Sequence, residues 1–157
     1  MRLLQTAVCF LLVALSAMAF AADERKAVFD LTTGDAKRIE THVIGAIKDL
    51  SDYYAKEGSD FKAVVVISGD AYKFFIDDLE RSPYKDDTDL KAVRAKLKPM
   101  LEELHVKYGV RFDLCGQGMK MRNIHPDTVF PFVNTDKSKY VYLINWQNAG
   151  YAYIPVS

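Results

Sequence analysis

The chain has 157 residues, of which 50% are hydrophobic and 27% charged, and its 21 basic side chains balance its 21 acidic ones. This length suits a single domain with a substantial core. The absence of a basic excess argues against nucleic acid as a partner, because attraction to a phosphate backbone depends on such an excess.

The N-terminus has the pattern of a secretory signal peptide. Arg2 provides a positive start, residues 3–15 are almost unbroken apolar sequence, and small alanines follow before charge arrives at Asp23. The apolar run is shorter than the ~20 residues that a membrane-spanning helix needs, so an uncleaved anchor is the less favoured alternative. We therefore expect a periplasmic or secreted protein.

The position of cleavage follows from the small residues. The motif Ala19-Phe20-Ala21 predicts cleavage after Ala21, with cleavage after Ala19 as the alternative. Residues 1–21 then form the signal peptide and residues 22–157 the mature domain. Loss of one basic residue with the signal leaves a net charge of about −1, and we expect no membrane span in the mature chain.

The remaining sequence alternates between strand-like and helix-like segments. Apolar residues spaced by three and four over 36–56 favour an amphipathic helix. The β-branched run over 61–68 is typical of a strand buried in a parallel sheet. In chain order, the predicted elements are strand 26–32, helix 36–56, strand 61–68, short helix 71–79, helix 88–108, strand 110–114, a turn and short helix within 116–123, strand 128–133, helix 138–148 and strand 151–156.

Two segments of this order combine conflicting signals. Residues 140–146 have strand propensity, but an alternating α/β order requires a helix before the last strand, so we predict a helix over 138–148. Pro99 lies inside a helical pattern and predicts a kink there. The alternation as a whole favours one layered α/β domain with a mainly parallel sheet.

A single thiol stands at the end of the strand predicted over 110–114. Because Cys9 leaves with the signal peptide, Cys115 is the only cysteine expected in the mature chain and has no partner for an internal disulfide. Ligands and reactive groups gather at the carboxyl ends of parallel strands. Cys115 is therefore a candidate working thiol; a buried inert residue and a disulfide with another molecule are the alternatives.

The residues after Cys115 favour the working thiol. Gly116 and Gly118 permit a tight turn and the close approach of another backbone. If a helix starts near Gly118, its free N–H groups point toward the sulfur and, with Lys120 and Arg122, favour thiolate over thiol.

Other candidates are weaker. His125 could meet Cys115 through loop folding and activate it, although a surface histidine is the simpler interpretation. Ser68 and Gly69 follow the second strand and could line a pocket at the same sheet edge, or simply form a turn. No histidines have metal-ligand spacing and no nucleotide motif is complete, so we expect neither a metal nor a cofactor.

The segment from Cys115 to Ile124, Cys-Gly-Gln-Gly-Met-Lys-Met-Arg-Asn-Ile, resembles the DsrE/DsrF-like family. Members of that family have a cysteine at a strand end, followed by a short helix with small, apolar and basic residues. The closing run over 147–154 is similar to the family's ending, and Ile67-Ser68-Gly69-Asp70 matches the second-strand turn more weakly. The resemblance extends over about 26–156.

The resemblance implies a five-stranded, mainly parallel sheet between helices, in flavodoxin-like style, and homo-oligomers that are often trimers or larger. In the sulfur-relay branch the matching cysteine carries sulfur as a persulfide between cytoplasmic partner proteins, whereas this chain has a signal peptide. Together with the predicted signal peptide, the resemblance implies that this chain is a periplasmic sulfur-binding or sulfur-relay protein with a persulfide on Cys115. The amides of Gly116, Gln117 and Gly118 would stabilise the charge, and donor and acceptor proteins would be partners.

Two other functions remain open on the sequence. One is a non-catalytic, oligomeric module that binds a ligand or partner and has a structural cysteine. The other is a thiol-redox protein, which would need a mixed disulfide with another chain because it has no second cysteine.

Overall fold

Five parallel strands form the central sheet, in the spatial order β4-β3-β2-β1-β5. The computed structural model describes residues 24–157, so the predicted signal peptide lies outside the described residues. The strands are β1 (Glu24–Leu31), β2 (Asp60–Ile67), β3 (Arg111–Leu114), β4 (Val133–Asn134) and β5 (Ala152–Val156). Every neighbouring pair is parallel, which confirms the predicted five-stranded parallel sheet.

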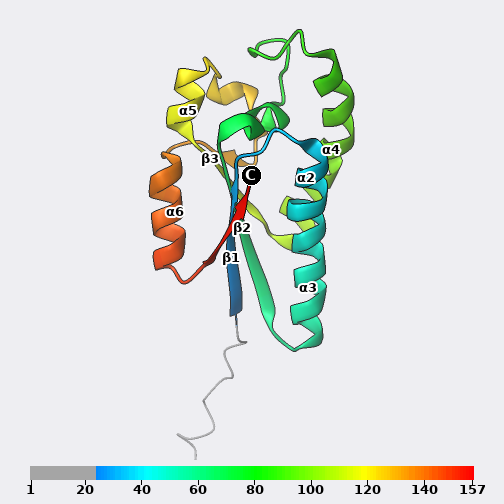
Figure 1. The fold of residues 1–157 in the computed structure, drawn as a ribbon, viewed down its shortest axis with the longest axis vertical. Helices are drawn as coiled ribbons and strands as arrows, with labels where there is room; N and C mark the ends of the chain where they lie inside the picture. Colours follow the sequence, from blue (N-terminus) through cyan, green and yellow to red (C-terminus); the bar gives the residue numbers. More distant parts are fainter. Residues whose placement is uncertain (1–23) are drawn as a thin grey trace, which may run out of the picture.

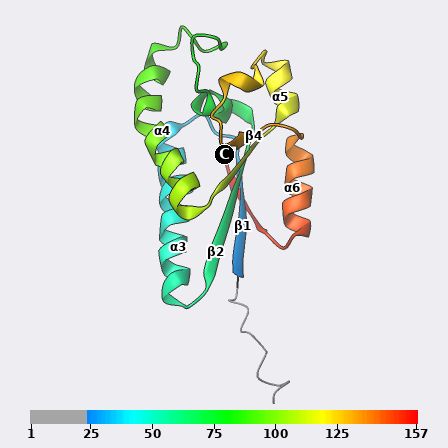
Figure 2. The same ribbon diagram turned by 180° about the vertical axis from the view of Figure 1, so that it is seen from behind.

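Helices cover both faces of the sheet, which confirms the predicted α/β/α layering. Both views show α2, α3 and α4 on one face and α6 on the other (Figures 1 and 2). The helices are α2 (Ala36–Ile39), η2 (Glu40–Gly45), α3 (Ala46–Lys56), η3 (Gly69–Phe75), α4 (Thr88–Tyr108), α5 (Gly116–Met121), η4 (Pro126–Thr128) and α6 (Lys139–Asn148). No helix within residues 24–157 is long and apolar enough to cross a membrane.

The helix predicted over 36–56 forms over its full length, but its middle part, η2, is a π-helix. Asp35 caps its start, because its side chain accepts hydrogen bonds from the backbone N–H groups of Lys37 and Arg38 at 2.8 and 3.3 Å. The short helix predicted over 71–79 is the 3₁₀-helix η3, which begins two residues earlier, at Gly69, and ends four residues earlier, at Phe75. Pro99 lies within α4 without ending it.

The strand predicted over 128–133 is wrong. That segment is the end of η4, an irregular stretch and only the first residue of the two-residue β4. Phe130 N–H donates to Phe75 O at 3.1 Å, and Val129 forms an isolated antiparallel bridge with Ile76. The backbone here is thus paired with the segment after η3, and Pro131 has no N–H to offer a sheet.

The helix predicted over 138–148 is confirmed as α6, against the strand propensity of its residues. β4 and β5 lie at opposite edges of the same parallel sheet. Joining them requires a crossover, and a helix satisfies the backbone of that crossover internally. Topology therefore outweighed local propensity.

The two faces of the sheet are buried differently. The main hydrophobic cluster lies on the face of α3 and α4. A second cluster, on the face of α6, contains Val28, Val64, Val66, Tyr142 and Leu143. Two buried carboxylates share this face: Asp30 lies two residues after Val28 along β1 and is paired with Val66 on β2, and Asp113 on β3 is paired with the same Val66. α6 is therefore packed on a small apolar cluster flanked by buried charge.

Candidate functional site

Cys115 lies where β3 meets α5, at the carboxyl edge of the sheet. Its N–H donates to Ile67 O at 2.9 Å, so the thiol residue stands beside the end of β2. α5 begins directly at Gly116, two residues earlier than the helix start predicted near Gly118, and Cys115 is its N-cap. The residue is 8% exposed. The thiol therefore lies at a strand end, nearly buried, at the start of a helix.

Gly116 and Gly118 are required here by space. A Cβ on Gly116 would stand 2.2 Å from Thr135 O, and one on Gly118 would stand 2.0 Å from the Tyr72 hydroxyl. Neither glycine has a left-handed φ, so neither is needed for a special turn. The predicted close approach of another backbone is present, and it comes from the segment that leads to α6.

The surroundings of the sulfur favour the thiolate. Burial raises the pKa of Cys115, but the amides of Gly118, Lys139 and Gln117, together with the Tyr72 hydroxyl, outweigh burial and hold that pKa below its ordinary value. The Cys115 sulfur makes no capping hydrogen bond to a backbone N–H of α5. We therefore ascribe the lowered pKa to the dipoles of these groups. Because Lys139 is the first residue of α6, two helix N-termini act on one thiol.

Tyr72 links the thiol residue to a cation. Its hydroxyl donates to Cys115 O at 2.8 Å, and its side chain is 1% exposed. The Arg122 guanidinium lies 4.8 Å from the centroid of the Tyr72 ring. Burial, followed by the contact with Cys115, raises the pKa of Tyr72. The phenol therefore stays protonated near neutral pH and remains a donor.

The side chains of the basic residues and of His125 are not among the groups that lower the pKa of Cys115. Arg122 reaches Tyr72 and not the thiol. Lys120 and the exposed His125 line a cavity of about 370 Å³ that also borders Gly116. Neither is among the groups that shift the pKa of Cys115. A Cys–His pair is therefore not formed in this structure.

Ser68 and Gly69 form the turn after β2. Ser68 is buried, and its N–H donates to Leu31 O at 2.9 Å. Gly69 has a φ of 61°, and a Cβ there would stand 2.6 Å from Thr32 O, so only glycine fits. These residues lie at the carboxyl edge of the sheet, as expected, and contact the end of β1, but they do not line the cavity beside Gly116.

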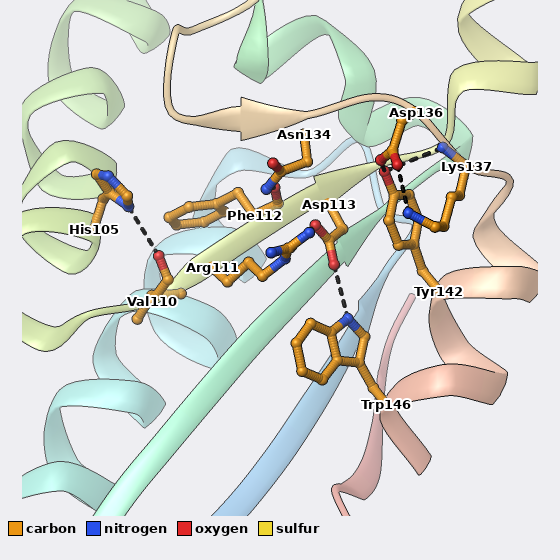
Figure 3. A network of polar contacts seen from close by, with 10 residues as sticks. All are labelled: His105, Val110, Arg111, Phe112, Asp113, Asn134, Asp136, Lys137, Tyr142 and Trp146. Atoms are coloured by element: carbon orange, nitrogen blue, oxygen red, sulfur yellow. Dashed lines mark hydrogen bonds and ion pairs between the residues drawn. The ribbon is translucent and has the colours of Figure 1, made fainter. Parts of the chain in front are cut away.

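Asp30, Asp113, Tyr72 and Lys139 were missed by the sequence argument. Asp113 is fully buried; it accepts from Arg111 Nε at 2.8 Å and from Trp146 Nε1 at 2.7 Å (Figure 3). A carboxylate among buried apolar neighbours in a strand, as at Asp30 and Asp113, is the signal that could have found two of the four. Tyr72 and Lys139 carry no such signal.

The same close-up shows how the start of α6 is fixed. The Tyr142 hydroxyl donates to Asp136 Oδ1 at 2.6 Å and accepts from Lys137 N–H at 3.2 Å (Figure 3). Lys137 O in turn accepts from Gly116 N–H at 2.9 Å. The loop before α6 is therefore tied both to its own helix and to the residue after the thiol. Within residues 24–157, no three His, Cys, Asp or Glu side chains gather as a metal site.

The fold and this site define a parallel α/β protein with one thiol at a strand end. The sequence model of the DsrE/DsrF-like family matches residues 14–156, and the chain belongs to that family.

One sequence relative and one solved structure are similar to this chain. It is 30% identical over 134 residues to an uncharacterized protein of Aquifex aeolicus (strain VF5), a match that covers 85% of this chain and 57% of that relative. A solved structure of a protein of unknown function from Methanobacterium thermoautotrophicum superposes with a TM-score of 0.62 at 20% identity, over 83% of this chain and 98% of the other. The second likeness supports the fold alone.

Proposed function

We propose that this protein is a periplasmic sulfur-binding or sulfur-relay protein that carries sulfane sulfur as a persulfide on Cys115. The observation that supports this proposal most strongly is the position of the nearly buried thiol between the N-terminal turns of α5 and α6, where its pKa is lowered. Membership of the DsrE/DsrF-like family, which includes sulfur carriers, points the same way.

The loading step needs only the thiolate and a persulfide donor. The Cys115 thiolate attacks the outer sulfur of a donor R–S–SH, a new S–S bond forms, and the donor's S–S bond breaks. R–S⁻ leaves with the electron pair, and Cys115 becomes Cys–S–SH. An acceptor thiolate then attacks the outer sulfur and restores the Cys115 thiolate. The amides that favour the thiolate also favour a persulfide anion, because both place negative charge at the same helix ends.

Intact-mass analysis tests the proposal directly. The mature protein is incubated with an organic persulfide and weighed before and after reduction with dithiothreitol. We expect a gain of one sulfur atom in the wild type, reversed by reduction, and no gain in Cys115→Ser. The absence of a gain, or an equal gain in Cys115→Ser, would contradict sulfur carriage.

A ligand- or partner-binding module with a structural cysteine is the second candidate, and the observation in its favour is the 8% exposure of Cys115. A small alkylating reagent distinguishes the two candidates. A structural thiol reacts only on unfolding, whereas a carrier thiol reacts in the folded protein faster than a free cysteine at the same pH.

We also propose that the protein is exported and self-associates. The signal pattern supports export, and N-terminal sequencing of protein from the periplasm should begin at Ala22.

An exposed apolar surface supports self-association. This surface, called the α6 surface, consists of Tyr140, Val141 and Ile144, which are 70%, 42% and 56% exposed.

A further inference from the structure

Two buried carboxylates lie under α6, one toward each end of the helix. Asp30 on β1 and Asp113 on β3 are both paired with Val66 on β2, so they stand in one row of the sheet. Asp113 accepts from Trp146 in the last turns of α6, and Asp30 contacts Lys139, its first residue. Burying a carboxylate costs free energy unless the charge is paired. Each of these two contacts therefore holds one end of α6 in position.

Asp30 has one partner from α6 and one from β5. Lys139 Nζ lies 3.0 Å from Asp30 Oδ1, and the Tyr153 hydroxyl donates to Oδ2 at 2.8 Å. Oδ1 receives no directed hydrogen bond, so Lys139 is held by charge. The two side chains are 22% and 7% exposed, so water screens this pair weakly. Asp113 is the other titratable group in the row.

The backbone of Lys139 acts on the Cys115 thiol. Gly116 N–H donates to Lys137 O at 2.9 Å, and Thr135 O would collide with a side chain at Gly116. The segment 135–137 therefore lies against the residue that follows Cys115, and α6 begins two residues later. The Lys139 amide is among the groups that favour the Cys115 thiolate. Lys139 thus touches Asp30 with its side chain and acts on the sulfur with its backbone.

We propose that Asp30 is a positioning residue for the Cys115 thiol. By holding the Lys139 side chain, it keeps the Lys139 amide, at the start of α6, directed at the sulfur. Asp30 touches neither the sulfur nor a substrate in this role and acts only through α6. The role of the thiol as a sulfur carrier rests on the proposed function above, but the position of α6 does not.

The test compares three variants by the pH dependence of Cys115 alkylation with iodoacetamide. Asp30→Asn and Lys139→Met each break the ion pair and should raise the apparent pKa of the thiol, slowing alkylation about two- to fivefold below that pKa. Asp113→Asn removes the other carboxylate of the row, which contacts Trp146 in the last turns of α6 and not Lys139, so it should not raise the pKa of Cys115.

The signs separate positioning from direct charge effects. Loss of a negative charge at Asp30 would by itself lower the pKa of a nearby thiol, and loss of a positive charge at Lys139 would raise it. Positioning requires a rise in both variants, and a rise in the double variant no larger than in either single one. Opposite shifts, no shift, or an equal shift in Asp113→Asn would overturn the proposal.

Two further measurements keep the outcome clear. Circular dichroism checks that each variant is folded, and if Asp30→Asn does not fold, Asp30→Thr takes its place, because it also removes the carboxylate that holds Lys139 and its β-branched side chain suits a strand. Sulfur loading by intact mass is measured in parallel. A pKa shift in the variants without sulfur loading in the wild type would contradict sulfur carriage and support the positioning role. Sulfur loading in the wild type without a pKa shift in the variants would support sulfur carriage and contradict the positioning role.

Discussion

At the scale of single residues, Cys115 is subject to two opposing effects. Its burial disfavours the thiolate, while the amides at the starts of α5 and α6 and the Tyr72 hydroxyl favour it, and the second effect is larger. A thiolate that is both shielded and stabilised is suited to hold a reactive sulfur away from solvent.

Replacing Tyr72 with Phe should raise the pKa of the Cys115 thiol. The change removes only the hydroxyl, which donates to Cys115 O at 2.8 Å and is one of the groups that favour the thiolate. Alkylation below the thiol pKa should slow by about two- to fivefold, as expected for loss of one hydrogen bond. Tyr84→Phe is the control, since Tyr84 is half-buried near Arg122 and is not among the groups acting on the sulfur. Equal rates in wild type and Tyr72→Phe would contradict this assignment.

The lowered pKa of Cys115 also predicts how stability depends on pH. The folded state loses the thiol proton at a lower pH than the unfolded state, whose value is about 8.5. The thiol therefore adds stability as pH rises from the folded pKa toward the unfolded one, keeps it fully above that, and loses it as pH falls through the folded pKa.

Urea unfolding of the wild type and Cys115→Ser at several pH values measures this contribution. The free energy of unfolding of the wild type minus that of Cys115→Ser should increase with pH in that window and level off above it. A difference that decreases with pH would mean that burial, and not the helix N-termini, has the larger effect on the pKa of Cys115.

At the scale of secondary-structure elements, α5 is placed by the two glycines that follow the thiol. Gly118→Ala should destabilise the protein by about 1–3 kcal/mol, because its Cβ would stand 2.0 Å from the Tyr72 hydroxyl and force Tyr72 or α5 to move. Gly45→Ala is the matched control, since its Cβ meets only Glu40 O at 3.4 Å within a helix. That substitution should be neutral or stabilise by up to about 1 kcal/mol. Thermal unfolding of both variants checks the contrast, and equal losses would contradict it.

The elements also show what the sequence could and could not predict. The periodicity of 36–56 and the β-branched run of 61–68 predicted their elements, because burial on one or both faces leaves a direct pattern. The strand over 128–133 failed because the pairing of Phe130 with Phe75 depends on a distant segment. α6 was predicted only by the alternating order, since its own residues favour a strand.

The candidate site follows the same division. Cys115 and its two glycines were found because their chemistry is local in the chain. Lys139 was missed, since its part in the site comes from a backbone amide that any residue at the start of α6 would provide. Tyr72 was missed because an aromatic residue in an apolar segment is usually core. Two groups from distant segments complete the site: the Tyr72 hydroxyl, 43 residues before Cys115, and the Lys139 amide, 24 residues after it.

At the scale of the whole molecule, α6 is the element with an unexplained surface. A helix that is apolar on its outer as well as its inner face is typical of one that is covered on both sides. The α6 surface is followed in the chain by β5, which is an edge strand of the sheet that residues 24–157 form and carries the 45% exposed Tyr153. A second copy of the chain could cover both, which is the basis for the proposed self-association.

Ile144→Glu tests that proposal, since it places a charge in the middle of the α6 surface, where the side chain is 56% exposed and its replacement leaves the core intact. Light scattering after size-exclusion chromatography should give an oligomer for the wild type and a smaller species for Ile144→Glu. Val106→Glu is the control, because Val106 is 81% exposed on α4 and lies outside the surface. A monomeric wild type, or an oligomer unaffected by Ile144→Glu, would exclude this surface. Loss of the oligomer with an unchanged Cys115 pKa would further show that each subunit forms its thiol site alone, as the contacts of α5 and α6 within one chain imply.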